Sequence, residues 1–178
     1  MKKVFAVISI SLLFPLFAYG FTPDPRDQDL YDELHKMFDI ESKDPFWKDK
    51  PYPINFSILY QSLTKNIKQF SKHEMFLFLY WAHIVNEEGW SHTGAEVSKL
   101  MEPAFIDNKT QFIDFLIAKS HLTNSTCKSI SDSFTITNFS VEEMNKARNE
   151  FLKKYRNVFI NNLSPEQSTQ CLSNFTKN

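Results

Sequence analysis

The sequence predicts an all-α, single-domain bundle of about seven to eight helices, with long and short helices alternating around a central apolar helix. Apolar residues recur at intervals of three and four along several segments, and helix-capping motifs precede most of these segments. Glycine is nearly absent, since the chain contains only three glycines, at positions 20, 89 and 94. Phosphate-binding loops and nucleophile elbows need glycine at sharp turns. The sequence therefore excludes nucleotide-binding α/β folds and elbow-type serine hydrolases.

Residues 1–20 have the organisation of a cleavable signal peptide. Two lysines follow the first Met, and the apolar run that ends at Ala18 carries no charge. Ala18 and Gly20 then supply the small residues that a signal peptidase requires before a cleavage site at Phe21. The alternative is an uncleaved membrane anchor, which is disfavoured because the run is shorter than a spanning helix and contains Pro15.

The mature chain is expected to be one all-helical domain over residues 21–178, secreted or located in the periplasm. Loss of Lys2 and Lys3 with the signal changes the formal net charge from −1 to about −3. A slightly acidic chain without clustered Lys and Arg is a poor match for nucleic-acid phosphates. We therefore expect no nucleic-acid partner, and no membrane span after signal cleavage.

The N-terminal half of the domain combines two helical stripes, an irregular strap and the central helix. After Asp24 and Pro25, the first helix carries an apolar stripe formed by Leu30, Leu34, Met37 and Phe38. Residues 44–53 contain three prolines and are expected to form the strap. A second stripe consists of Phe56, Leu59, Tyr60, Leu63, Ile67 and Phe70. Residues 75–85 are apolar on every side, which predicts the central buried helix, ending at Gly89.

The C-terminal half is expected to alternate short and long helices. A short helix over 94–102 should end at Pro103, because proline interrupts the hydrogen-bond ladder. The spacing of apolar residues then predicts helices over about 109–121, 125–133, 141–162 and 165–175. Capping boxes pair a Ser, Thr or Asn with Glu or Gln three residues later, and they occur at Ser71/Glu74, Thr93/Glu96, Asn108/Gln111, Ser140/Glu143 and Ser164/Gln167.

Cys127 and Cys171 are the only cysteines in the chain. Two thiols in an oxidising compartment usually pair, and neither cysteine belongs to a CxxC motif. We expect an intramolecular disulfide that fastens the last helix to the body of the domain.

His83, Glu87 and His92 are weak candidates for a metal site, because two imidazoles and a carboxylate could bind zinc. His83 and Glu87 are four residues apart and share a helix face, whereas His92 follows the Gly89 turn and would have to fold back. The HExxH motif is absent, and a histidine on a buried helix more often forms a hydrogen bond in the core. We therefore expect neither a metal nor a cofactor. His121 stands alone on its predicted helix.

The candidate binding residues are large aromatics in the predicted non-helical segments. Phe46, Trp47 and Tyr52 belong to the proline-rich strap, and Trp90 belongs to the turn after the central helix. Trp and Tyr are the typical anchors of protein interfaces, and loops carry recognition more often than packed helices do. The other interpretation is that the strap buries these rings against the bundle.

No catalytic motif is present, so the sequence favours a small helical protein that acts by binding another protein, as an inhibitor or toxin-neutralising protein would. One alternative is a carrier whose Phe-rich core opens around a small apolar ligand. Another is a metal-dependent hydrolase that uses the two histidines and Glu87. The chain also contains six Asn-x-Ser/Thr sequons, which would accept glycans in a eukaryotic secretory pathway, at Asn55, Asn108, Asn124, Asn138, Asn162 and Asn174.

Overall fold

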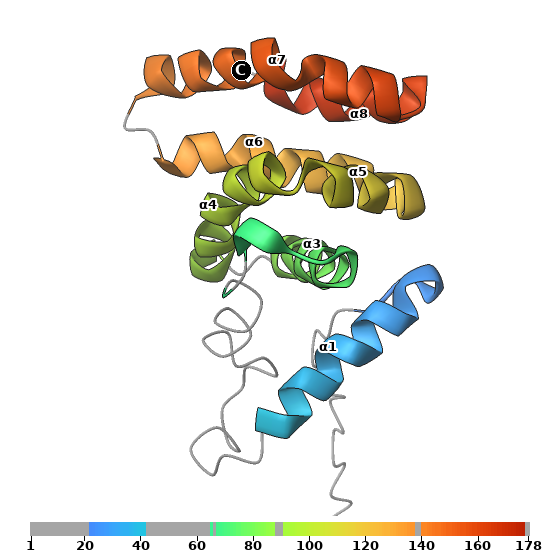
Figure 1. Cartoon of the computed structure of the whole chain (residues 1–178). Helices are drawn as coiled ribbons and strands as arrows, with labels where there is room; N and C mark the ends of the chain where they lie inside the picture. The colour runs from blue at the N-terminus through green and yellow to red at the C-terminus, as the bar shows by residue number, and fades with distance from the viewer. Residues whose placement is uncertain (1–21, 42–64, 66, 88–90, 138–139, 177–178) are drawn as a thin grey trace, which may run out of the picture.

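The computed structural model in Figure 1 describes residues 22–41, 65, 67–87, 91–137 and 140–176. Every regular element within these ranges is helical, which confirms the all-α class. The α-helices are α1 Gln28–Glu41, α3 Lys72–Glu87, α4 Ser91–Asp107, α5 Lys109–Ala118, α6 Thr123–Thr137, α7 Val141–Asn162 and α8 Pro165–Thr176. Three short 3-10 helices accompany them: η1 Pro25–Asp27, η2 Ile67–Gln69 and η3 Ser120–Leu122.

The helices are stacked in layers (Figure 1). Helices α7 and α8 pack together as one outer layer, α5 and α6 lie next to them, and α3 and α4 follow. Helix α1 contacts the bundle through α3. The face of the α7–α8 layer that points away from α6 is not covered by any other helix of the described part. The predicted signal peptide 1–20 and the predicted strap 44–53 lie outside the described residues.

Helix α3 forms the predicted central apolar helix. Its buried residues are Met75, Leu77, Phe78, Leu79, Tyr80, Trp81, Ala82, Ile84 and Val85. A helix that is apolar on every side must be covered on every side, and α1, α4, α5 and α6 all pack against α3.

A second part of the core is built from aromatic rings of α4, α7 and α8. The ring of Phe105 stacks on that of Phe159 with centroids 5.2 Å apart, and Phe151 stacks on Phe175 at the same separation. Phe105 also meets the edge of Tyr155 at 5.3 Å. Such offset and edge-on pairs contribute about 0.5–1.5 kcal/mol each beyond their buried area. The abundant phenylalanine therefore fills the space between helices.

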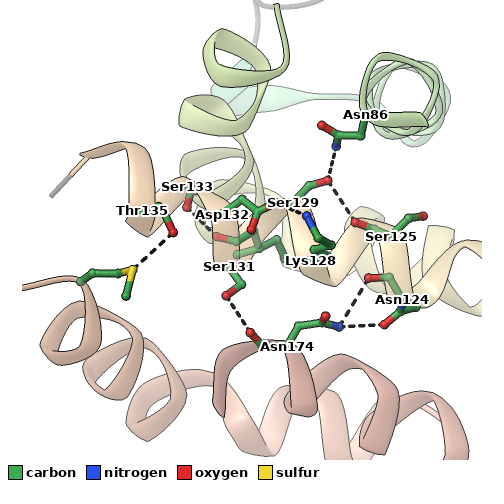
Figure 2. A network of polar contacts seen from close by, with 12 residues as sticks. Asn86, Asn124, Ser125, Lys128, Ser129, Ser131, Asp132, Ser133, Thr135 and Asn174 are labelled. Carbon is green, nitrogen blue, oxygen red and sulfur yellow. Dashed lines mark hydrogen bonds and ion pairs between the residues drawn. The ribbon is translucent and has the colours of Figure 1, made fainter. Parts of the chain in front are cut away.

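Helix α6 lies in the middle of the bundle although it is rich in Ser and Thr. Figure 2 shows its hydroxyls bonding to helices on two sides: Asn86 of α3 donates to Ser129 Oγ at 2.6 Å, and Ser131 Oγ donates to the carbonyl of Asn174 in α8 at 2.8 Å. Other hydroxyls, such as that of Ser133, bond to carbonyls one turn back in α6 itself. Because its side chains are short, α4 and α8 can both pack closely against it.

The predicted disulfide is present between α6 and α8. Cys127 and Cys171 are joined with their Cα atoms 5.1 Å apart, and both residues are fully buried. The bond fastens the last helix of the chain to the middle of the bundle, as expected.

Three of the predicted capping boxes are confirmed. Ser71 and Glu74 cap α3 reciprocally, since each side chain accepts from the other residue's backbone N–H, at 3.2 and 2.8 Å. The pair Ser164/Gln167 does the same for α8. At the start of α7, Ser140 Oγ accepts from the N–H of Glu143 at 3.1 Å. These caps place the helix starts where the sequence predicts them.

Helix α4 shows where the sequence prediction is wrong. It begins at Ser91 and continues through Pro103 to Asp107, so the helix does not end at the proline. Pro103 and Lys99 are both exposed, so water can satisfy the carbonyl that loses its bond. Thr93 lies inside the helix and not at its N-cap position, so the predicted Thr93/Glu96 box does not mark the helix start. The sequence also predicts short helices at α4 and α6, but they have 17 and 15 residues.

The predicted Asn108/Gln111 box is also wrong. Asn108 occupies the N-cap position of α5, but its side chain makes no capping bond. Its Oδ1 instead accepts from the N–H of Phe70 at 2.9 Å, and its amide donates to the carbonyls of Ile67 and Ala104 at 2.6 and 3.1 Å. The buried amide therefore joins the α4–α5 corner to the segment before α3.

Candidate functional site

The three metal-site candidates are placed on two helices. His83 and Glu87 lie on α3, and the start of α4 at Ser91 makes His92 helical, which corrects the expectation that it follows the helix in a turn. The side chain of His92 is outside the described part. His83 Nδ1 lies 3.2 Å from the hydroxyl of Ser125 in α6, as expected of a hydrogen-bonded core histidine. Within the described residues, no group of three His, Cys, Asp or Glu side chains is arranged to hold a metal ion.

The burial of His83 changes its protonation. Loss of hydration lowers the pKa of the imidazole below its ordinary value, and His121 acts in the same direction. Glu87 and Asp27 oppose this shift. The folded protein therefore favours the neutral ring, which suits its hydrogen bond to an uncharged hydroxyl.

Phe46, Trp47, Tyr52 and Trp90 all lie outside the described residues. Their role in protein recognition stays a prediction.

The structure brings together a charged cluster that sequence reasoning missed. Asp27, at the end of η1, is only 1% exposed, and its carboxylate is paired with two side chains that are distant from it in the sequence. Lys119 Nζ lies 2.9 Å from Oδ1, and His121 Nε2 lies 2.7 Å from Oδ2. Lys119 also donates to the carbonyl of Arg26 at 2.6 Å. This Asp27 cluster fastens the start of the described chain to the turn between α5 and α6.

A groove with a volume of about 610 Å³ runs along the outer surface between α7 and α8. Its apolar floor is provided by Leu152 of α7 and Leu172 of α8, both partly buried against the core. Polar side chains such as Asn149, Thr169 and Ser173 line its sides. The groove lies in the outer layer, where it is open to solvent.

Two cations dominate the electrostatics of the α7–α8 groove. Lys153 and Arg156 line it, both are exposed, and no acidic residue belongs to its lining. Neither cation forms an ion pair with a carboxylate of the described part. Residues 153, 156 and 160 share a helix face, so the exposed Ile160 adds apolar surface on α7 one turn beyond Arg156. The surface therefore combines apolar contact area with uncompensated positive charge.

The groove is held in a fixed shape by its supporting contacts. Helix α8 is fastened to α6 by the disulfide and by Ser131, and its start is capped by Ser164. Helix α7 is fastened to α6 by Arg148, whose guanidinium donates to the carbonyl of Ser131 at 3.2 Å and to Thr135 Oγ1 at 3.0 Å. A preformed groove loses less conformational entropy when a partner binds.

Comparison with known proteins identifies no relative of this chain. No family model, no curated protein and no solved structure matches the chain. In the part of the chain that the structure describes, no helix has both the length and the hydropathy that crossing a membrane requires.

Proposed function

We propose that this protein is an extracytoplasmic binding module that recognises an acidic segment of another protein through the α7–α8 groove. The observation that carries the proposal is the pairing of Leu152 and Leu172 with Lys153 and Arg156 on one open surface. A partner helix with leucine-like residues on one face and carboxylates beside them would satisfy both features. Charge complementarity of this kind guides partner choice and raises the association rate.

The location outside the cytoplasm is supported by the predicted signal peptide and by the disulfide. Binding another protein is favoured over the two alternatives. The carrier hypothesis rests on the abundance of Phe, yet rings such as Phe105 and Phe159 are packed against each other. The hydrolase hypothesis relies on His83, which forms a hydrogen bond with the hydroxyl of Ser125.

A pair of synthetic helical peptides tests the proposal on the full mature chain. One peptide carries Glu and Leu in an amphipathic pattern, and the other has the same pattern with Lys in place of Glu. We expect only the acidic peptide to bind, with NMR shift changes on α7 and α8. We expect the affinity to fall steeply as salt is added, because the attracting charges are exposed.

Charge reversal identifies the surface. The double variant Lys153→Glu/Arg156→Glu should lower the affinity for the acidic peptide by at least about tenfold. Lys65→Glu/Lys68→Glu changes the same charge on two exposed residues, one shortly before η2 and one within it, and should have little effect. Equal weakening in both variants, equal binding of both peptides, or shift changes confined to another face would contradict the proposal.

A further inference from the structure

A second concave surface lies where η3 and the start of α6 meet the first half of α8. It has a volume of about 470 Å³, within the range of small-ligand pockets. All of its lining residues are polar, and they include Ser120, His121, Asn124, Glu166 and Gln170. The α7–α8 groove shares none of these residues, so this η3–α8 pocket is a separate site.

His121 enters the η3–α8 pocket with a fixed orientation. Its Nε2 lies 2.7 Å from Oδ2 of the buried Asp27, and a carboxylate only accepts hydrogen bonds, so Nε2 carries the proton. In the neutral ring, Nδ1 then has a lone pair and acts as an acceptor. Lys119 balances the charge of Asp27 from the other carboxylate oxygen. The Asp27 cluster thus fixes the orientation of the His121 ring at the pocket.

Two further lining groups have unused hydrogen-bonding capacity. Asn124 Oδ1 accepts from the amide of Asn174 at 3.1 Å, which orients the side chain between α6 and α8 (Figure 2). The amide hydrogens of Asn124 form no bond with any described residue. The exposed carboxylate of Glu166 likewise has no partner in the described part. The pocket therefore offers acceptors, a donor and one formal negative charge.

We propose that the η3–α8 pocket binds a small polyhydroxylated ligand that carries one protonated amine, as an amino sugar does. One ammonium group would match the single uncompensated carboxylate of Glu166. Hydroxyl groups would match His121 Nδ1, the Asn124 amide and the hydroxyl of Ser120, because a hydroxyl both donates and accepts. A lining without apolar side chains disfavours hydrophobic ligands. The inference does not depend on the α7–α8 groove.

Glucosamine and glucose form a matched pair of probes, because they differ only in the amine. We titrate each into the folded mature chain and follow backbone amides by NMR. Glucosamine should shift amides of residues 120–124 and 164–170, and glucose should bind at least about tenfold more weakly, the size of one charge-assisted hydrogen bond. Equal affinities, no binding of glucosamine, or shifts outside these two segments would overturn the proposal.

Two substitutions separate a specific site from general attraction. Glu166→Gln keeps the shape of the side chain and should remove the preference for glucosamine, leaving the two sugars within about twofold of each other. Glu142→Gln changes the same charge on α7, away from the pocket, and should leave the preference intact. Loss of the preference in both variants, or in neither, would refute the assignment. Both residues are exposed, so neither variant should disturb folding.

Discussion

Asp27 is the only acidic side chain that is buried in the part of the chain described by the structure. A buried charge is tolerated when it is paired, and Asp27 forms an ion pair with Lys119 at one carboxylate oxygen and lies within hydrogen-bond distance of His121 at the other. Removing one member of such a group leaves the charges of the others uncompensated. The resulting loss of folding free energy is larger than the net stabilisation that the complete group provides.

We therefore expect Asp27→Asn to lower the free energy of unfolding by about 3 kcal/mol, measured by urea denaturation. The matched control is Asp29→Asn. Asp29 lies 3.6 Å from the same Lys119 Nζ but is 76% exposed, so its loss should cost less than about 0.5 kcal/mol. Equal effects of the two substitutions would show that burial does not determine the importance of Asp27.

His83 gives the protein a predicted sensitivity to acid. Its folded-state pKa is lowered by burial, whereas in the unfolded chain the ring titrates at about 6.5. The unfolded state therefore binds the extra proton first as the pH falls. The stabilising contribution of His83 is present above about pH 6.5 and is lost in more acidic solution.

The substitution His83→Gln tests this, because glutamine cannot titrate yet can still donate a hydrogen bond to Ser125. The urea midpoint of the wild type should decrease when the pH is lowered from about 7.5 to about 5.5, and the midpoint of the variant should decrease less. Parallel pH profiles would assign the acid sensitivity to the other histidines or to the carboxylates.

Asn108 and Asn162 show how differently two identical sequon residues can be used. Asn108 is buried and bonds to three backbone groups, whereas Asn162 is exposed and donates to the carbonyl of Val158 one turn back. Asn108→Ala should cost about 3 kcal/mol, since it leaves buried backbone groups unpaired, and Asn162→Ala less than about 0.5 kcal/mol. Thermal denaturation of both variants provides the comparison, and similar melting temperatures would contradict it.

Helices differ in how well their sequences predict them. Helix α7 begins and ends where its apolar stripe and its Ser140 cap predict, because both signals are local. Helix α4 is longer than predicted, because water at an exposed Pro103 relieves a penalty that would apply in the core. The central position of α6 was not predictable from hydropathy. Its buried Ser129 and Ser131 hydroxyls form hydrogen bonds with Asn86 and Asn174 of the neighbouring helices.

The link between α6 and α8 should account for a large part of the stability. Replacing both cysteines by alanine removes a cross-link between residues 44 positions apart, which should cost about 4 kcal/mol on the chain-entropy estimate. Urea denaturation of the double variant measures this loss. A change below about 1 kcal/mol would mean that packing alone holds α8 in place.

At the scale of the whole molecule, the fold class, the disulfide and the buried α3 were predictable from periodicity, cysteine count and composition. The Asp27 cluster was not, because Asp27 and His121 are 94 residues apart in the sequence and nothing local marks them as partners. The α7–α8 groove was missed for a related reason. Lys153 and Arg156 resemble an ordinary solvated helix face until α8 is placed beside them.

The predicted removal of residues 1–20 is a statement about the whole molecule, and intact mass spectrometry of the exported protein tests it. The mass should correspond to a chain that begins at Phe21 and should be smaller by the two hydrogens lost in the disulfide. The small residues Ala18 and Gly20 are the reason for this site. A mass that includes residues 1–20 would contradict both the cleavage site and the secretory route.

The complete burial of Cys127 and Cys171 also restricts the order of events during maturation. An oxidising enzyme cannot reach either sulfur once α8 is seated, so the thiols must meet while the last helix is still loose. Cys171 follows Cys127 by 44 residues, so oxidation has to wait until the segment that carries α8 has been made. Once α8 is packed in place, the same burial protects the disulfide from thiol exchange, so the bond formed during folding persists in the folded protein.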